Sequence, residues 1–188
     1  MIAAIHQPNF MPWYPFFQKI AAADVFILLT HCQFEKNNYQ NRFNQNDRWH
    51  TLSVNKGLQP IREKRYVNPE KDWNKICVNL QEHRSELSLF DNLITDNLAQ
   101  TNIAIIRTLC ERLGITTTIM TDYETEFTSS QRLVDLCESV GATTYLAGSG
   151  GSREYLDLAP FHSKDIHVEF QDPASMLRIP ILEFLATH

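Results

Sequence analysis

Two short, uninterrupted apolar runs near the N-terminus constrain the fold more than any other feature of this sequence. Residues 2–5 and 25–29 contain no polar side chain, which predicts strands that are buried on both faces. Pro12 suits the first turn of an intervening helix, and Phe16 and Ile20 recur at helical spacing. A strand, a helix and a strand within about 30 residues form a βαβ unit, so the two runs are predicted to be adjacent, parallel inner strands.

Helical and extended patterns continue to alternate along the chain. Two helical patterns end at Gly114 and Gly141, and glycine is the typical residue after a last helical turn. Ser129 or Ser130 is expected to cap the second of these helices. Short extended runs follow at residues 115–120, 142–147 and 166–170. This order predicts a single α/β domain over residues 1–188, with a mostly parallel, Rossmann-like sheet and helices on both faces.

A polar, amide-rich stretch at residues 31–50 is predicted to begin a small β-hairpin insertion. Residues 49–54 alternate in polarity after a turn at Asn46 and Asp47, and residues 61–67 are their expected partner strand. The periodicity predicts a short helix or a turn over 72–80 and a long helical region over 88–113.

Charge and cysteine content exclude several classes of protein. The net charge is −5, whereas binding to duplex nucleic acid needs clustered Lys and Arg, so no nucleic-acid partner is expected. Arg62, Lys64 and Arg65 are too few to change this and indicate a solvated face. Cys110 and Cys137 fall on apolar helical stripes, which indicates buried thiols in a reducing compartment. Without a signal-peptide pattern or an apolar stretch of about 18 residues, the sequence predicts a cytoplasmic protein that does not insert into membranes.

The first candidate site follows the first predicted strand. In an open parallel sheet, ligands bind beyond the carboxyl ends of the strands, and His6 and Gln7 lie at that point. A histidine there can act as an acid, a base or a hydrogen-bond donor to a developing anion. The alternative is a histidine that only satisfies loop carbonyls.

The second candidate site follows the second predicted strand. Lys36 and Arg42 are expected to hold a phosphate or a carboxylate, since the Arg42 guanidinium offers a bidentate fork. Three nearby amides, those of Gln33, Gln40 and Asn41, are expected to bind sugar hydroxyls or amides. The alternative is an ordinary polar loop.

The third candidate site is the segment Gly148, Ser149 and Gly150, between a strand and a predicted helix. Backbone N–H groups in such a segment can converge on an anion. The segment matches neither a Walker A motif nor a complete dinucleotide fingerprint, and a plain turn is the alternative. Because all three candidate segments follow predicted strands of one sheet, they are expected to border a single cleft.

Motifs through most of the chain resemble the WbqC-like family of bacteria. The resemblance rests on His6-Gln7-Pro8 with Pro12-Trp13, on Gln33-Phe34 with Lys36 and Gln40-Asn41-Arg42, and on Tyr145-Leu146-Ala147-Gly148 with Tyr155-Leu156. The resemblance implies a place in surface-polysaccharide (O-antigen, lipopolysaccharide) biosynthesis and an acyl or aminoacyl transferase activity, in particular glycyl transfer. Ala147 departs from the family pattern, where serine is usual, and Cys32 stands where an aliphatic residue is usual.

This resemblance implies transfer from a thioester to the amine of a sugar or small molecule. His6 is then expected to be the general base or an oxyanion donor, while Trp13 and Tyr155 wall the pocket. The implied partners are a small-molecule or nucleotide-sugar acceptor and a thioester of an acyl-carrier protein or coenzyme A. No resident cofactor and no metal are expected.

Two alternative functions remain open. His6 at the end of the first strand also resembles the layout of the nucleotidylyltransferase and pantothenate-synthetase superfamily, which would require ATP or CTP with Mg²⁺. Asn9 occupies the place of that superfamily's second histidine, which argues against this alternative. The other alternative is a non-catalytic module that binds a nucleotide sugar.

Overall fold

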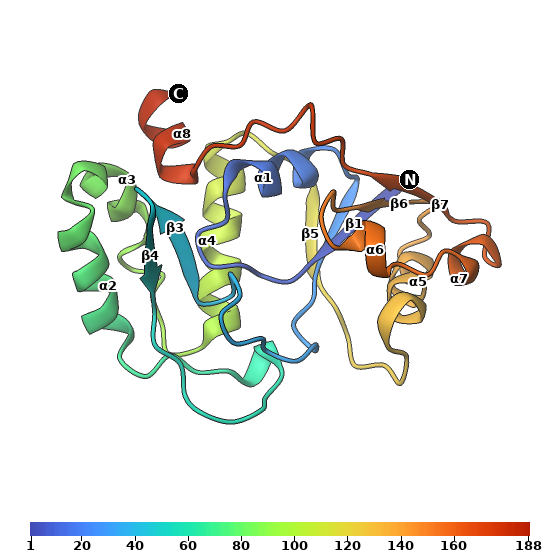
Figure 1. The fold of residues 1–188 in the computed structure, drawn as a ribbon, viewed down its shortest axis with the longest axis horizontal. Coiled ribbons are helices and arrows are strands. Elements are labelled where there is room, and N and C mark those ends of the chain that lie inside the picture. The colour runs from blue at the N-terminus through green and yellow to red at the C-terminus, as the bar shows by residue number, and fades with distance from the viewer. The chain divides into compact units, whose positions relative to one another are not determined.

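The computed structural model describes all residues from Met1 to His188 and divides into two compact units (Figure 1). Unit 1 contains Met1–His6, Pro15–Leu29 and Ile115–Leu177, and unit 2 contains Gln7–Tyr14, Thr30–Gly114 and Arg178–His188. A single domain over residues 1–188 stays a prediction, because two compact units can still fold together as one domain.

Unit 1 is built on a five-stranded, all-parallel sheet with strand order β5-β2-β1-β6-β7. The two apolar runs form β1 and β2, which are parallel neighbours inside the sheet, as their composition predicts. The strands are β1 (Ile2–His6), β2 (Val25–Leu28), β5 (Thr118–Thr121), β6 (Thr144–Ala147) and β7 (His167–Phe170).

Helices cover both faces of this sheet, which confirms the predicted α/β architecture (Figure 1). Helix α1 (Tyr14–Ala21) packs on one face, where the Phe16 ring lies 5.4 Å from the Phe26 ring of β2. The opposite face carries Ala3 and Ile5, whose side chains alternate with those of the first face. It forms the core with α5 (Ser129–Ser139) and α7 (Ala159–His162). The sheet is therefore shielded from water on both sides.

Unit 2 contains the predicted hairpin, but its pairing differs from the prediction. Strands β3 (Arg42–Gln45) and β4 (Arg48–Thr51) pair antiparallel around Asn46 and Asp47. Both turn residues have positive φ (53° and 56°), which is the geometry of a two-residue hairpin turn. Such a turn joins the two segments that flank it, so the preceding segment becomes the partner of β4. Residues 61–67 form no strand and begin with a 3-10 turn at Ile61–Glu63. Their predicted pairing with residues 49–54 is limited to one isolated antiparallel bridge, between Val54 and Tyr66.

The helical boundaries in unit 2 also differ in detail from the prediction. Helix α2 (Pro69–Asn79) matches the expected short helix. The predicted long region at 88–113 is instead a 3-10 turn (Ser88–Phe90) and helix α4 (Leu98–Arg112). The break occurs because Asn97 caps α4 by accepting a hydrogen bond from the Gln100 N–H at 2.9 Å. The remaining helices are α3 (Arg84–Leu87) and α8 (Ile181–Thr187) in unit 2, and α6 (Ser152–Tyr155) in unit 1.

The sequence predicted the C-terminal end of α5 correctly but not its N-terminal cap. Gly141 has a positive φ of 69° just after α5, as does Gly114 after α4 (67°), so both glycines occupy the left-handed position that ends a helix. At the other end, Thr128 precedes α5 and makes no side-chain capping bond. The expected cap by Ser129 or Ser130 is therefore wrong.

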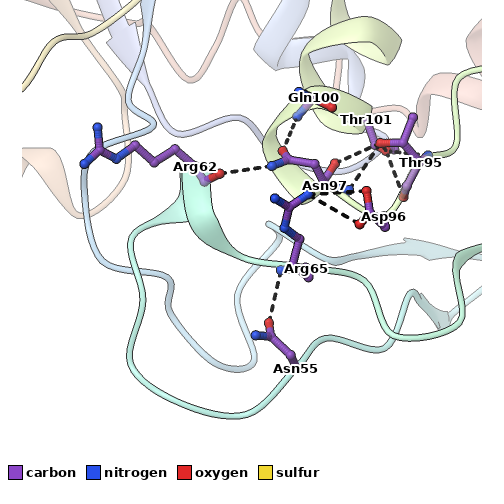
Figure 2. A network of polar contacts seen from close by, with 8 residues as sticks. All are labelled: Asn55, Arg62, Arg65, Thr95, Asp96, Asn97, Gln100 and Thr101. Carbon is purple, nitrogen blue, oxygen red and sulfur yellow. Dashed lines mark hydrogen bonds and ion pairs between the residues drawn. The ribbon is translucent and has the colours of Figure 1, made fainter.

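A polar network in unit 2 fixes the basic segment against the start of α4 (Figure 2). The Asn97 side chain donates to the Arg62 carbonyl at 3.1 Å, and Arg65 forms an ion pair with Asp96 at 3.3 Å. Both arginines are exposed, as expected of a solvated face. Lys64 departs from that expectation, because it is buried and donates to the Gly57 carbonyl at 2.9 Å.

Asn102 of α4 ties together three other segments of unit 2. Its fully buried amide donates to the carbonyls of Pro8 (2.8 Å) and Gln40 (2.7 Å), and it accepts from the Tyr66 hydroxyl at 2.9 Å. All three bonds satisfy groups that would otherwise be buried without a partner, which is costly. Asn102 therefore holds the chain after β1 and the loop before β3 in place.

No helix in the structure has an apolar stretch of the length needed to cross a bilayer.

Replacing Asn102 with alanine should destabilise the protein strongly. The variant leaves the Tyr66 hydroxyl and two buried carbonyls without their partner, and we expect a loss of about 3 kcal/mol in the free energy of unfolding. Urea denaturation measures this loss. The matched control is Gln100→Ala on the exposed surface of the same helix, for which we expect a change within about 0.5 kcal/mol. Equal effects of the two substitutions would contradict the role given to Asn102.

Candidate functional site

The carboxyl edge of the unit 1 sheet brings together two of the three predicted segments. β1 and β6 are parallel neighbours with Ala4 opposite Leu146. His6 is the last residue of β1 and Gly148 directly follows β6, so both lie at the carboxyl edge of the sheet. Ligands of open parallel sheets bind at this edge.

His6 is the last residue of β1, and aromatic packing restricts its ring. The ring meets Phe16 of α1 edge to face, with centroids 5.0 Å apart and planes at 78°. The His6 carbonyl accepts from the Leu29 N–H at 2.8 Å. Because both the backbone and the ring are held, the half-buried imidazole has a defined place at the end of the central strand.

Lys19 is a feature of this edge that the sequence analysis missed. Its side chain is only 3% exposed, and its Nζ donates to the Ile5 carbonyl at 2.9 Å. That carbonyl belongs to the peptide bond that joins Ile5 to His6. Burial lowers the pKa of Lys19 to about 7, because a charged amine is poorly solvated inside the protein. A detectable signal was its position three residues after Phe16, on the same apolar helical face.

The segment Gly148–Gly151 leaves its backbone N–H groups without protein acceptors. None of the N–H groups of Gly148, Ser149, Gly150 and Gly151 donates to a protein acceptor. None of the three glycines has a positive φ, and a Cβ added to Gly148 or Gly150 would meet nothing closer than 3.7 Å. Glycine is therefore not required here by backbone strain or by protein packing. At Gly150, what it provides is open space beside an unpaired N–H group.

The side chains around this segment include two exposed ones, those of Tyr155 and Arg153. Tyr155 is 83% exposed and lies beside Gly151. A Cβ atom added to Gly151 would lie 3.5 Å from the Tyr155 ring. The Ser149 hydroxyl contacts the Met176 sulfur at 3.3 Å. Arg153 of α6 lies over the ring of Phe170, the last residue of β7, at 4.9 Å.

In unit 2, the amides predicted to bind a ligand are used by the fold. Gln40 is fully buried, where its Oε1 accepts from the Glu35 N–H at 2.9 Å and its Nε2 donates to Gln7 Oε1 at 2.6 Å. Asn41 is also buried and donates to the Leu52 carbonyl at 2.9 Å. These bonds occupy both polar atoms of the Gln40 side chain and the Nδ2 of Asn41, so the fold itself accounts for them.

The cations of the same loop have different surroundings. Lys36 is exposed, whereas Arg42 is half-buried, lies over the Trp49 ring at 4.1 Å and donates to the Asn37 carbonyl. This packing fixes the guanidinium plane. Sequence reasoning missed Trp49, which is the residue across the hairpin that orients Arg42.

The remaining predicted site residues of unit 2 are Gln33, Trp13 and Gln7. Gln33 is exposed and donates to the Gln59 carbonyl at 2.9 Å, and Trp13 is 46% exposed. The Gln7 amide donates to the Cys32 sulfur at 3.5 Å. His6, Gly148–Gly150 and Tyr155 thus belong to unit 1 and the rest to unit 2, so the single cleft that joins all of them stays a prediction.

Neither buried cysteine is suited to nucleophilic chemistry. Cys110 and Cys137 are buried, as predicted, and burial raises their thiol pKa values to about 11 and about 12. A thiol with such a pKa carries almost no thiolate near neutral pH. No group of three or more His, Cys, Asp or Glu side chains is arranged to hold a metal ion.

Comparison with known proteins identifies the family. The model of the WbqC-like protein family matches residues 7–178. The chain belongs to the WbqC-like protein family. A relative in Mycobacterium tuberculosis, the uncharacterized protein Rv1507c, is 30% identical over 190 residues, which cover 90% of this chain and 81% of the relative. No solved structure matches this WbqC-like chain.

The stability of this WbqC-like chain should depend on the protonation of Lys19. The pKa of Lys19 is about 7 in the folded state and 10.5 for an unperturbed lysine, as in the unfolded chain. The unfolded state therefore binds more protons between these two pH values. Stability therefore rises as the pH increases from 7 to about 10 and falls as the pH returns to 7, by at most about 1.4 kcal/mol per pH unit.

Lys19→Met removes this dependence. We expect the difference in unfolding free energy, wild type minus Lys19→Met, to increase between pH 7 and pH 10 in urea denaturation experiments. Lys164→Met is the control, because Lys164 is exposed in the same unit and its replacement should leave the pH dependence of the wild type. A difference that stays constant with pH would show that Lys19 is not desolvated.

Proposed function

We propose that this WbqC-like chain transfers an acyl or aminoacyl group, such as glycyl, from a thioester to the amine of a sugar or another small molecule. The observation that carries this proposal is that His6 ends β1 at the same carboxyl edge of the sheet at which the unpaired backbone N–H groups of Gly148–Gly151 follow the neighbouring strand β6. Acyl transfer to an amine needs a proton acceptor and donors to an oxyanion. This edge supplies candidates for both.

In the proposed reaction, the acceptor amine attacks the thioester carbonyl and His6 takes a proton from the attacking nitrogen. The carbonyl oxygen becomes an oxyanion that accepts hydrogen bonds from the N–H groups of Gly148 and Gly150. A C–N bond forms, the C–S bond breaks, and the imidazolium returns the proton to the leaving thiolate. A general base typically contributes about 10²- to 10⁴-fold, and one oxyanion donor about 10²- to 10³-fold.

Binding roles are proposed for the exposed and cationic residues. Lys36 and Arg42 are suited to the phosphate groups of a nucleotide-sugar acceptor or of the carrier arm of a coenzyme A or acyl-carrier-protein thioester. Trp13 and Tyr155 offer exposed rings against which a substrate can pack. A cytoplasmic step in bacterial surface-polysaccharide biosynthesis would supply such substrates.

Substituting His6 tests the proposal. His6→Ala should lower kcat for glycyl transfer from a thioester to an amino sugar by about 10²-fold or more, because the attacking amine loses its base. His6→Asn keeps a hydrogen-bond donor but cannot accept a proton, so it should remain as inactive as His6→Ala. Rescue by asparagine would instead assign His6 to the oxyanion. Circular dichroism checks that both variants are folded.

The same protein preparation separates the proposal from nucleotidylyl transfer. The wild type is incubated with ATP or CTP and Mg²⁺, and pyrophosphate is measured. We expect none. Pyrophosphate release that depends on His6 would overturn acyl transfer. If the wild type transfers no acyl group, and the wild type and His6→Ala bind a nucleotide sugar with equal affinity, the chain is a binding module instead.

Cys32 should not carry the acyl group. It is half-buried, its sulfur accepts from the Gln7 amide, and the residue next to it along the chain, His31, is a poor activator because neighbouring side chains of an extended segment diverge. Cys32→Val should therefore retain activity within about twofold of the wild type, since the substitution keeps a small apolar side chain. Mass spectrometry with a thioester donor should detect no adduct on Cys32. A trapped acyl group there would replace direct transfer by a two-step mechanism.

A further inference from the structure

The hydrogen bonds of β1 show which donor the Ile5 carbonyl would meet in a regular sheet. In a parallel ladder, alternate residues of an inner strand bond to alternate neighbours. Ile2 and His6 face β2, because their carbonyls accept from the N–H groups of Asp24 (2.9 Å) and Leu29 (2.8 Å). Ile5 therefore faces β6, where the register makes the Gly148 N–H its expected donor.

The pairing between β1 and β6 ends before that bond is made. It stops at Ala4 and Leu146, and Gly148 N–H has no protein acceptor. The Ile5 carbonyl accepts from Lys19 Nζ at 2.9 Å instead. The amine of Lys19 thus stands where the backbone donor of β6 would be.

The loss of strand pairing is limited to one place in the sheet. We call this place the β1–β6 seam and define it by Ile5, His6, Ala147 and Gly148. On one side of it, β1 stays paired with β2 through His6 and Leu28. On the other side, β6 stays paired with β7 through Ala147 and Phe170, and the Gln171 N–H donates to the Ala147 carbonyl at 2.9 Å. The strands themselves are thus not frayed at this edge.

We propose that Lys19 is a positioning residue that replaces Gly148 as the donor to Ile5 and thereby leaves the Gly148 N–H for the oxyanion of the substrate. This inference rests on the acyl-transfer function proposed above, because an oxyanion needs a donor beside the base His6. Lys19 touches neither the substrate nor the reacting atoms. It acts through the Ile5–His6 peptide and through the seam.

The cost of burying an amine supports a specific role over simple packing. A methionine has a similar length and would fill the same space without desolvating a charge. Burial lowers the pKa of Lys19 to about 7, which shows that this site disfavours the charged form. A residue that only filled the space behind β1 would not need an amine.

Amide hydrogen exchange, measured by NMR on the full chain, tests the geometry. In the wild type the Gly148 N–H should exchange fast, as an unpaired amide does. In Lys19→Met it should pair with the Ile5 carbonyl and exchange at least about tenfold more slowly. The Gln171 N–H is the internal reference and should be unchanged, and Lys164→Met is the matched lysine control. Slow exchange of Gly148 in the wild type, or no change in Lys19→Met, overturns the inference.

The transfer assay tests the consequence for catalysis. Lys19→Met should lower kcat by about tenfold or more with little change in KM, since an oxyanion donor acts in the transition state, and Lys19→Arg should recover part of kcat. A loss seen only in KM, or no loss, would contradict the positioning role.

Two results separate this inference from the proposed function. Slow exchange in Lys19→Met without any transfer by the wild type means that the seam works as described and acyl transfer is wrong. Transfer that depends on His6 but not on Lys19 means that acyl transfer is right and the positioning role of Lys19 is wrong. If Lys19→Met does not fold, the wild type still decides, because a scalar coupling across the bond from Lys19 Nζ to the Ile5 carbonyl must then be present and the Gly148 amide unprotected.

Discussion

The parallel pairing of β1 between β2 and β6 is the constraint on which the candidate site depends. β1 is short, apolar and buried on both faces, so burial and hydrogen bonding fix its place in the middle of the sheet. Because parallel strands end at the same edge, fixing β1 also places its last residue, His6, at the edge where the segment after β6 begins. A histidine in a flexible loop would have no such defined neighbours.

Buried polar side chains then shape the chain around this sheet and in unit 2. Asn102, Gln40 and Lys19 are all buried, and each has a hydrogen bond to a backbone group. Asn102 and Lys19 donate to carbonyls of other elements, and Gln40 accepts from the Glu35 N–H of its own loop. The physical reason is the same in each case, since an unpaired buried carbonyl or N–H costs more than a bonded one gains. The two amides hold loops in place, whereas the lysine bonds to a strand whose regular partner is missing.

That distinction matters for how a ligand would be recognised. Gln40 and Asn41 are buried and already make hydrogen bonds within the protein, so few of their polar atoms are available to a substrate. Backbone groups without protein partners, at Gly148–Gly151, retain their full capacity to donate. The candidate chemistry of unit 1 therefore lies more in the main chain and in His6 than in the amide-rich loop of unit 2 that stands out in the sequence.

The sequence alone determined the features that depend on local pattern. The apolar runs predicted β1 and β2, the glycines predicted the ends of α4 and α5, and the motifs around His6 and Arg42 predicted the family. These follow from periodicity, turn chemistry and short motifs, which are written in neighbouring residues. Tertiary structure decided that β3 is the partner of β4, that Gln40 is buried and that Lys19 reaches Ile5. Such contacts join residues whose proximity depends on the packing of the whole unit. No local pattern specifies to which carbonyl a lysine donates its hydrogen bond.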